Sequence, residues 1–183
     1  MPRLESVANL AMIVAAVAII GDKAYDRLHP ARRPASAAFA TKYLGRPFPG
    51  LSSFPVRDGA PSVLLFFSSR CHYCSESMPF YKRLTSLRSA TSGFAMVGIY
   101  PQGVETEADE EAYLAEHGVA LDALGPMSFS QLMLPGTPTL LLLDQSKAVR
   151  GIWTGRLSHD KEEEVLQRLH ALCPRCGGRS KGT

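Results

Sequence analysis

Two cysteines separated by two residues, Cys71 and Cys74, carry the clearest chemistry in this sequence. They follow the apolar run 63–67 and open a stretch whose apolar residues recur at helical spacing. A thiol at the start of a helix faces unpaired N–H groups and the positive end of the helix dipole, which both favour the reactive thiolate. The C-x-x-C spacing lets the second sulfur resolve a mixed disulfide. We therefore predict Cys71 as the attacking thiol and Cys74 as the resolving thiol, with a structural disulfide or half of a zinc site as alternatives.

An alternation of strand and helix patterns must position this pair. From residue 62 onward the predicted order is strand, helix, strand, helix, strand, strand and helix. The predicted ranges are 63–67, 71–87, 94–100, 106–118, 138–143, 149–154 and a last helix from residue 158 or 160 to about 172. The first strand is continuously apolar, as expected for a strand that is buried on both faces. The sequence therefore indicates an α/β domain.

The domain resembles the thioredoxin superfamily, and more narrowly its membrane-anchored TlpA/ResA-like thiol-disulfide oxidoreductases. Over about residues 46–172, the matching segments are Phe66-Phe67 before the Cys-His-Tyr-Cys motif, Met78-Pro79, Gly136-Thr137-Pro138-Thr139 and Leu143-Asp144. The resemblance implies a thioredoxin-like fold with a central mixed β-sheet flanked by helices. It also implies a cis peptide bond before Pro138 beside the two cysteines, and a Thr137 backbone that binds extended substrate.

Two positions depart from the family pattern. Arg70 stands where a tryptophan usually precedes the first cysteine, and we interpret it as a solvated surface residue, with stabilisation of the thiolate as the alternative. Ser77 occupies the place of a glutamate that is common in the narrower family. Glu76, one residue earlier, is then a weak candidate for proton handling at Cys74.

The two residues between the cysteines are expected to tune the thiolate. A protonated His72 would favour the Cys71 thiolate and so an oxidant or isomerase. Tyr73 resembles the tyrosine of bacterial disulfide-isomerase motifs, whereas the overall frame resembles reductants of cytochrome c maturation. The direction of electron flow, reductant or oxidant and isomerase, therefore stays open at this point.

A second cysteine pair, Cys173 and Cys176, follows the last predicted helix. In the implied fold this helix runs away from the catalytic end, and about 13 residues at 1.5 Å each place its tail roughly 20 Å from Cys71. The pair is thus expected to act apart, as a local disulfide or idle thiols in a flexible tail at 173–183, with an intermolecular zinc clip or an auxiliary redox pair as alternatives. We expect no metal site and no cofactor other than the redox-active Cys71–Cys74 disulfide.

The N-terminal region carries an apolar run, Val7 to Ile20, within an expected signal anchor at residues 1–28. A cleaved signal peptide and a buried helix are the alternatives. Residues 29–45 are expected to form a linker that tethers the domain to the membrane. We expect the domain to face the periplasm, although the basic residues after the run argue weakly against export: Lys23, Arg27, Arg32 and Arg33.

These features together predict a membrane-tethered thiol-disulfide oxidoreductase that acts on protein thiols and contributes to cell redox homeostasis. A membrane or periplasmic electron donor or acceptor would complete its cycle. The net charge of +3 over 183 residues is too small to argue for nucleic-acid binding. The alternative function is a thiol-based copper or zinc handler, for which Met78 and His72 would be the nearest extra ligands.

Overall fold

The computed structural model describes residues 35–54 and 59–173. The expected anchor at residues 1–28 lies outside this part of the chain, as does Cys176. Within the described residues, no helix is both long enough and apolar enough to span a membrane.

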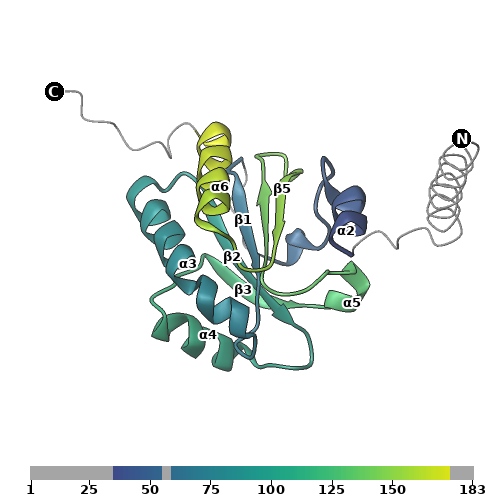
Figure 1. The fold of residues 1–183 in the computed structure, drawn as a ribbon, viewed down its shortest axis with the longest axis vertical. Coiled ribbons are helices and arrows are strands. Elements are labelled where there is room, and N and C mark those ends of the chain that lie inside the picture. Colours follow the sequence, from purple (N-terminus) through teal and green to yellow (C-terminus); the bar gives the residue numbers. More distant parts are fainter. Residues whose placement is uncertain (1–34, 55–58, 174–183) are drawn as a thin grey trace, which may run out of the picture. The chain divides into compact units, whose positions relative to one another are not determined.

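Five strands form one mixed sheet at the centre of the domain (Figure 1). They are β1 (Ser62–Phe66), β2 (Ala95–Pro101), β3 (Ala123–Met127), β4 (Thr139–Leu143) and β5 (Val149–Thr154). Their order across the sheet is β3-β2-β1-β4-β5. The β1/β2 and β2/β3 pairs are parallel, whereas β1/β4 and β4/β5 are antiparallel. The expected mixed sheet is therefore present, and β1, which leads to the cysteine pair, is its central strand.

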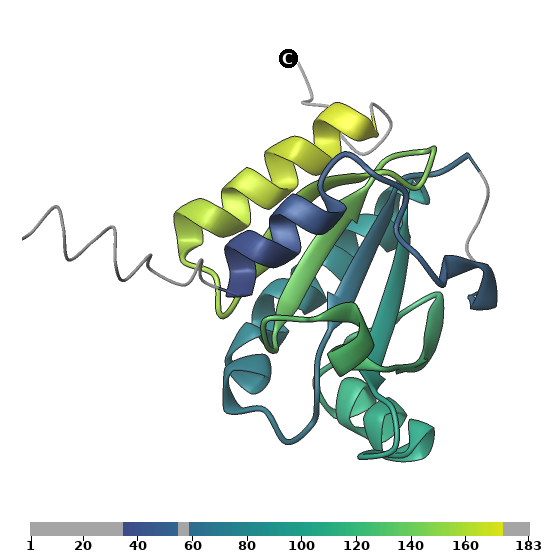
Figure 2. The same cartoon turned by 90° about the vertical axis from the view of Figure 1, so that its right-hand side faces the viewer.

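Helices cover both faces of this sheet (Figures 1 and 2). One face carries α3 (His72–Thr91), α4 (Glu107–Glu116) and α6 (His159–Leu172). The other face carries α2 (Ala35–Tyr43) and the short α5 (Phe129–Leu132), with a 3-10 turn at Leu51–Ser53. Successive side chains of a strand point to opposite faces, so a strand between two helical layers must be apolar throughout. All five residues of β1 and all five of β4 are buried accordingly.

The alternation divides the core into two clusters. Val63 and Leu65 of β1 pack on the side of α3 and α6, where Leu84 of α3 and Leu169 of α6 are both fully buried. Leu64 and Phe66 point to the other side. That second cluster is rich in aromatic rings, which contact one another in a chain: Phe39, Tyr43, Phe48, Phe66 and Phe129.

Helix α2 corrects the expected linker. Residues 35–43, which were expected to belong to the linker at 29–45, are helical and belong to the folded domain. Phe39 and Tyr43 lie four residues apart and so on one side of the helix, where both are buried. The Tyr43 hydroxyl also donates to the carbonyl oxygen of Leu132 over 3.1 Å. The physical reason for the helix is the second face of the sheet, which needs an apolar cover.

The other predicted elements are present with shifts of a few residues at their ends, but β3 and α5 were not predicted. Strand β3 has the sequence Ala-Leu-Gly-Pro-Met, in which Gly125 and Pro126 weaken any strand signal. Proline lacks the N–H donor for a ladder and is tolerated on an edge strand. Its position at the edge, paired only with β2, is what permits Pro126 there.

Candidate active site

The cysteine pair sits where β1 passes into α3. Cys71 is the N-cap residue of α3, with extended backbone angles, and the backbone N–H groups of Cys74 and Ser75 donate to its carbonyl oxygen over 2.9 and 3.2 Å. Cys71 is half-buried, whereas Cys74, in the first turn, is fully buried. Both are free thiols. The more accessible sulfur is thus the one that precedes the helix, as expected for an attacking thiol.

The loop that precedes β4 closes the site from the opposite side. The Thr137–Pro138 peptide bond is cis, as the resemblance implies. The sulfur of Cys71 lies 3.3 Å from the carbonyl oxygen of Thr137, to which its thiol donates. Antiparallel pairing brings the two loops together, because Thr139 at the start of β4 pairs with Phe66 at the end of β1. The predicted meeting of Cys71 and Pro138 is therefore a consequence of register.

The surroundings of the two sulfurs differ in their effect on ionisation. Partial burial opposes ionisation of Cys71, but hydrogen bonds with the Thr137 side chain, with Cys74 and with the Tyr73 backbone outweigh it and lower the pKa of the Cys71 thiol. Burial raises the pKa of the Cys74 thiol far above its ordinary value, and the hydrogen bond and charge of Cys71 raise it further. The more accessible sulfur, that of Cys71, is therefore the easier of the two to ionise, whereas the buried sulfur of Cys74 is held as a thiol.

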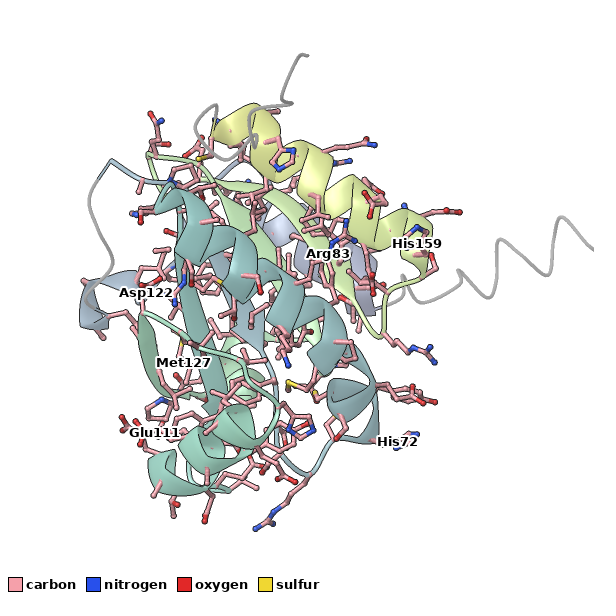
Figure 3. The ribbon with its side chains drawn as sticks, turned by 90° about the vertical axis from the view of Figure 1, so that its left-hand side faces the viewer. His72, Arg83, Glu111, Asp122, Met127 and His159 are labelled. Carbon is pink, nitrogen blue, oxygen red and sulfur yellow. The ribbon has the colours of Figure 1, made fainter. Side chains whose placement is uncertain are left out.

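The residues between and beside the cysteines lie on the outer surface. His72 is 78% exposed and its Nε2 atom lies 3.3 Å from Oε1 of Glu76, one turn later. Figure 3 shows His72 pointing away from the body of the domain. Tyr73 is 58% exposed beside it, and Arg70 is exposed in the preceding turn.

Glu76 is not placed to handle the proton of Cys74. Its carboxylate pairs with His72 and also with Arg156, whose Nη1 atom lies 3.2 Å from Oε2 of Glu76. Cys74 lies in the core, among residues such as Met78 and Tyr81. The outward direction of Glu76 follows from helix geometry, since two residues separate Cys74 and Glu76 by about 200° around the axis.

Two acidic residues that sequence reasoning missed lie next to the site. Glu110 in the first turn of α4 accepts hydrogen bonds from the backbone N–H and the hydroxyl of Ser69, at 3.1 and 2.6 Å. Glu105, before α4, accepts from the Ser68 hydroxyl. A glutamate in the first turn of a helix is ordinarily solvated and interacts favourably with the helix dipole. The available signal was topological, because the loops that follow parallel neighbours β1 and β2 emerge at the same end of the sheet.

Cys173 lies at the far end of the domain. It is the C-cap of α6, it is buried and it is disulfide-bonded. Its sulfur lies 3.2 Å from the carbonyl oxygen of Gly93, just before β2 begins, whereas Cys71 follows the end of the parallel strand β1. The expected separation from the catalytic pair is therefore present, but Cys173 belongs to the folded core instead of a flexible tail at 173–183. Its burial among apolar residues of α6 is the physical reason.

No metal-binding cluster of three or more His, Cys, Asp or Glu side chains occurs within residues 35–54 and 59–173. The Cys71 thiol itself lies against the Thr137 carbonyl oxygen and is followed along the chain by the exposed side chains of His72 and Tyr73. This arrangement can perform nucleophilic attack by sulfur on a substrate that approaches along the Thr137–Pro138 loop.

No model of a known protein family matches the sequence, and no curated protein matches it either. Solved structures do match. A protein named as a thiol:disulfide interchange protein DsbE, from Chlorobium tepidum, is 22% identical with a TM-score of 0.52, over 65% of this chain and 82% of that one. A thiol-disulfide isomerase from Corynebacterium glutamicum is 18% identical with a TM-score of 0.53, over 63% and 82%. A thioredoxin-like superfamily protein is 20% identical with a TM-score of 0.51, over 66% and 82%.

Proposed function

We propose that this chain, which has a thioredoxin-like fold, is a thiol-disulfide oxidoreductase that exchanges disulfides with protein thiols through Cys71 and Cys74. The observation that carries the proposal is the contact between the Cys71 sulfur and the carbonyl oxygen of Thr137, directly before cis Pro138. The accessible thiol thus lies against the backbone of the loop that precedes β4, and the Cys74 thiol is buried three residues further along the chain. Structures with the same fold include proteins named for thiol-disulfide interchange and isomerisation.

The exchange takes place in two steps. The Cys71 thiolate attacks one sulfur of a substrate disulfide, a new S–S bond forms, and the substrate's other sulfur leaves as a thiolate that takes a proton from water. Cys74 then loses its proton to water and attacks the Cys71 sulfur. The Cys71–Cys74 disulfide forms, the mixed disulfide breaks, and the second substrate sulfur leaves as a thiolate that takes a proton from water. Two electrons pass from the cysteine pair to the substrate, and oxidation of a substrate dithiol is the same sequence in reverse.

The environments of the two sulfurs suit these roles. The lowered pKa of Cys71 favours its thiolate, and the raised pKa of Cys74 keeps that thiol protonated until the mixed disulfide exists. Burial of Cys74 also excludes outside disulfides from it. Attack by the wrong sulfur is thereby suppressed by both access and ionisation.

We propose that residues 1–28 anchor the chain in a membrane with the domain on the periplasmic side, where a membrane or periplasmic partner supplies or removes electrons. Reporter fusions at the C-terminus test the orientation, and a reporter that is active only in the cytoplasm would overturn it. The reduction potential of the Cys71–Cys74 couple tests the direction, since about −120 mV indicates an oxidant and about −270 mV a reductant.

Insulin reduction and refolding of scrambled ribonuclease by the full chain test the activity itself. We expect the wild type to be active, Cys71→Ser to be inactive, and Cys74→Ser to accumulate a mixed disulfide with substrate, because attack remains while resolution is lost. Cys71→Ser is the matched control, since it removes the other sulfur of the same pair. A wild-type protein that exchanges no disulfides and copurifies with stoichiometric copper or zinc would overturn the proposal.

A further inference from the structure

The turn between β5 and α6 lies beside the Thr137–Pro138 loop. The backbone N–H of Gly155 donates to the carbonyl oxygen of Pro138 over 2.7 Å, and β5 pairs with β4, which begins directly after this loop. The backbone of the next residue, Arg156, is therefore held close to the segment that receives the substrate. The exchange steps described above do not use the Arg156 side chain.

Arg156 reaches from this turn to the start of α3. Its Nη1 atom lies 3.2 Å from Oε2 of Glu76, and the other carboxylate oxygen of Glu76 lies 3.3 Å from Nε2 of His72. One carboxylate is thus shared between two basic side chains that come from different parts of the chain. If Arg156 moves away, Glu76 keeps its polar contact with His72 and is not left without a partner.

The ion pair between Arg156 and Glu76 is exposed and therefore weak. The two side chains are 59% and 33% exposed, respectively. Ion pairs in contact with water contribute little to stability, because each charge is well solvated without the other. A carboxylate that arrives with a substrate can therefore replace Glu76 as the partner of Arg156 at small cost in free energy.

Arg156 also lines a groove on the surface of the domain. The groove has a volume of about 590 Å³ and lies between α2, β5 and the start of α6. Ile152 and Leu157 contribute apolar surface to it, and the two charged residues among the described residues that line it, Arg156 and Lys161, are both cations. Lys161 pairs with Glu164 of its own helix, whereas Arg156 adjoins the loop beside Cys71. The groove is thus continuous with the candidate active site at Arg156.

We propose that Arg156 is a specificity-determining residue, which exchanges Glu76 for a carboxylate of the substrate and so favours polypeptide disulfides that have an acidic residue close to the reactive cysteine. The substrate segment lies along the Thr137–Pro138 loop and continues into the groove, where its acidic side chain meets Arg156. This inference deepens the proposed exchange function and rests on it, because Arg156 acts on the substrate that Cys71 attacks.

Peptides that carry one cysteine as a mixed disulfide with thionitrobenzoate test this preference. The Cys71 thiolate of the reduced full chain attacks the peptide sulfur, a disulfide forms between Cys71 and the peptide, and thionitrobenzoate leaves as a coloured thiolate. Each peptide is made with aspartate at one position near the cysteine and again with asparagine there, so that the two differ by a single charge. Positions on both sides of the cysteine are compared, and Cys71→Ser gives the background release.

Four variants separate the contact from the general charge of the domain. Arg156→Gln removes the contact, Arg156→Lys keeps the charge, and Glu76→Gln removes the carboxylate that competes with the substrate. Arg83→Gln is the matched control, because Arg83 is 49% exposed and pairs with Glu163 of α6 over 2.7 Å. Arg83 thus forms an ion pair of the same kind, but it lies further along α3 and away from His72 (Figure 3).

We expect the wild type to react with the best aspartate peptide about threefold faster than with its asparagine counterpart at low ionic strength, and this ratio of second-order rate constants to fall in high salt. Arg156→Gln should abolish the preference, whereas Arg156→Lys should retain part of it. Glu76→Gln should increase the ratio, because Arg156 then has no competing carboxylate. Arg83→Gln should leave the ratio unchanged.

Equal rates with both peptides in the wild type, or a preference that survives in Arg156→Gln, would overturn the inference and leave the exchange function intact. A loss of preference in Arg83→Gln as large as that in Arg156→Gln would also overturn it, since the overall charge of the domain would then be responsible. A wild type that releases no thionitrobenzoate above the Cys71→Ser background would overturn the proposed function, and the preference with it.

Discussion

Asp144 at the turn between β4 and β5 gives a stability prediction with a defined pH window. Its carboxylate accepts from the backbone N–H groups of Ser146 and Ala148, at 2.8 and 3.1 Å, and from Nε of Arg150 at 2.6 Å. Partial burial would raise the pKa of Asp144, but hydrogen bonds from Ser146, Arg150 and Ala148 outweigh it and lower the pKa from 3.8 to about 2. The turn joins β4, which follows the Thr137–Pro138 loop, to β5. Thr139, the first residue of β4, pairs with Thr154 of β5.

The size of this contribution to stability follows from the difference between the pKa values of Asp144 in the folded and unfolded states. At 1.36 kcal/mol per pKa unit, a fall from 3.8 to about 2 corresponds to about 2.4 kcal/mol of stability. Arg150 is 51% exposed, so solvent screening reduces this to about 1 to 2 kcal/mol. Because the folded-state pKa is the lower one, the contribution is present above pH 3.8 and is lost as the pH falls toward 2.

Asp144→Asn is therefore expected to lower the free energy of unfolding by about 1 to 2 kcal/mol at pH 7 and by roughly half as much at pH 3. Urea unfolding followed by circular dichroism at the two pH values measures both differences. Arg150→Gln, made alone and together with Asp144→Asn, serves as the control, since its effect should be small once the carboxylate is gone. An equal loss at pH 7 and pH 3 would show that the ionised carboxylate is not the source of the stability.

Two further changes test the core and a helix end. Leu141→Ala in the buried second cluster should cost about 2 to 5 kcal/mol in urea unfolding, whereas Ile152→Ala, at its half-buried partner in β5, should cost less; equal costs would contradict the assignment of the two positions. Thr106→Ala removes the N-cap acceptor for the Asp109 backbone N–H and should lower stability by about 1 kcal/mol, while Thr106→Ser should retain it; a loss with serine as large as with alanine would refute the cap.

Much of the fold could be predicted because its signals are local. The continuously apolar first strand, the helix expected over 106–118 and the two strands expected at 138–143 and 149–154 each depend on periodicity or end signals within about ten residues. The features that escaped prediction depend on contacts across the chain. Phe39 and Tyr43 become informative only when the second face of the sheet is known to need a cover.

The residues of the candidate site also fall into those that could be predicted from the sequence and those that could not. Cys71, Cys74 and Pro138 could be found because a motif fixes their chemistry and a strand register brings them together. Glu110 could not, since nothing in its neighbourhood distinguishes a glutamate that turns inward to Ser69 from one that faces water. Glu76 was instead a candidate that the structure directs away from Cys74. Closeness in sequence to Cys74 does not place the two side chains on one side of a helix.

Helix α2 has a practical consequence for any shortened form of the protein. A fragment that begins at residue 46, where the family resemblance starts, would lack Phe39 and Tyr43 and would leave Leu64, Phe66 and Leu141 exposed along one face of the sheet. Exposed apolar surface of this kind promotes association between molecules. A fragment intended for assay or crystallisation should therefore begin before Ala35, so that the domain retains its own cover.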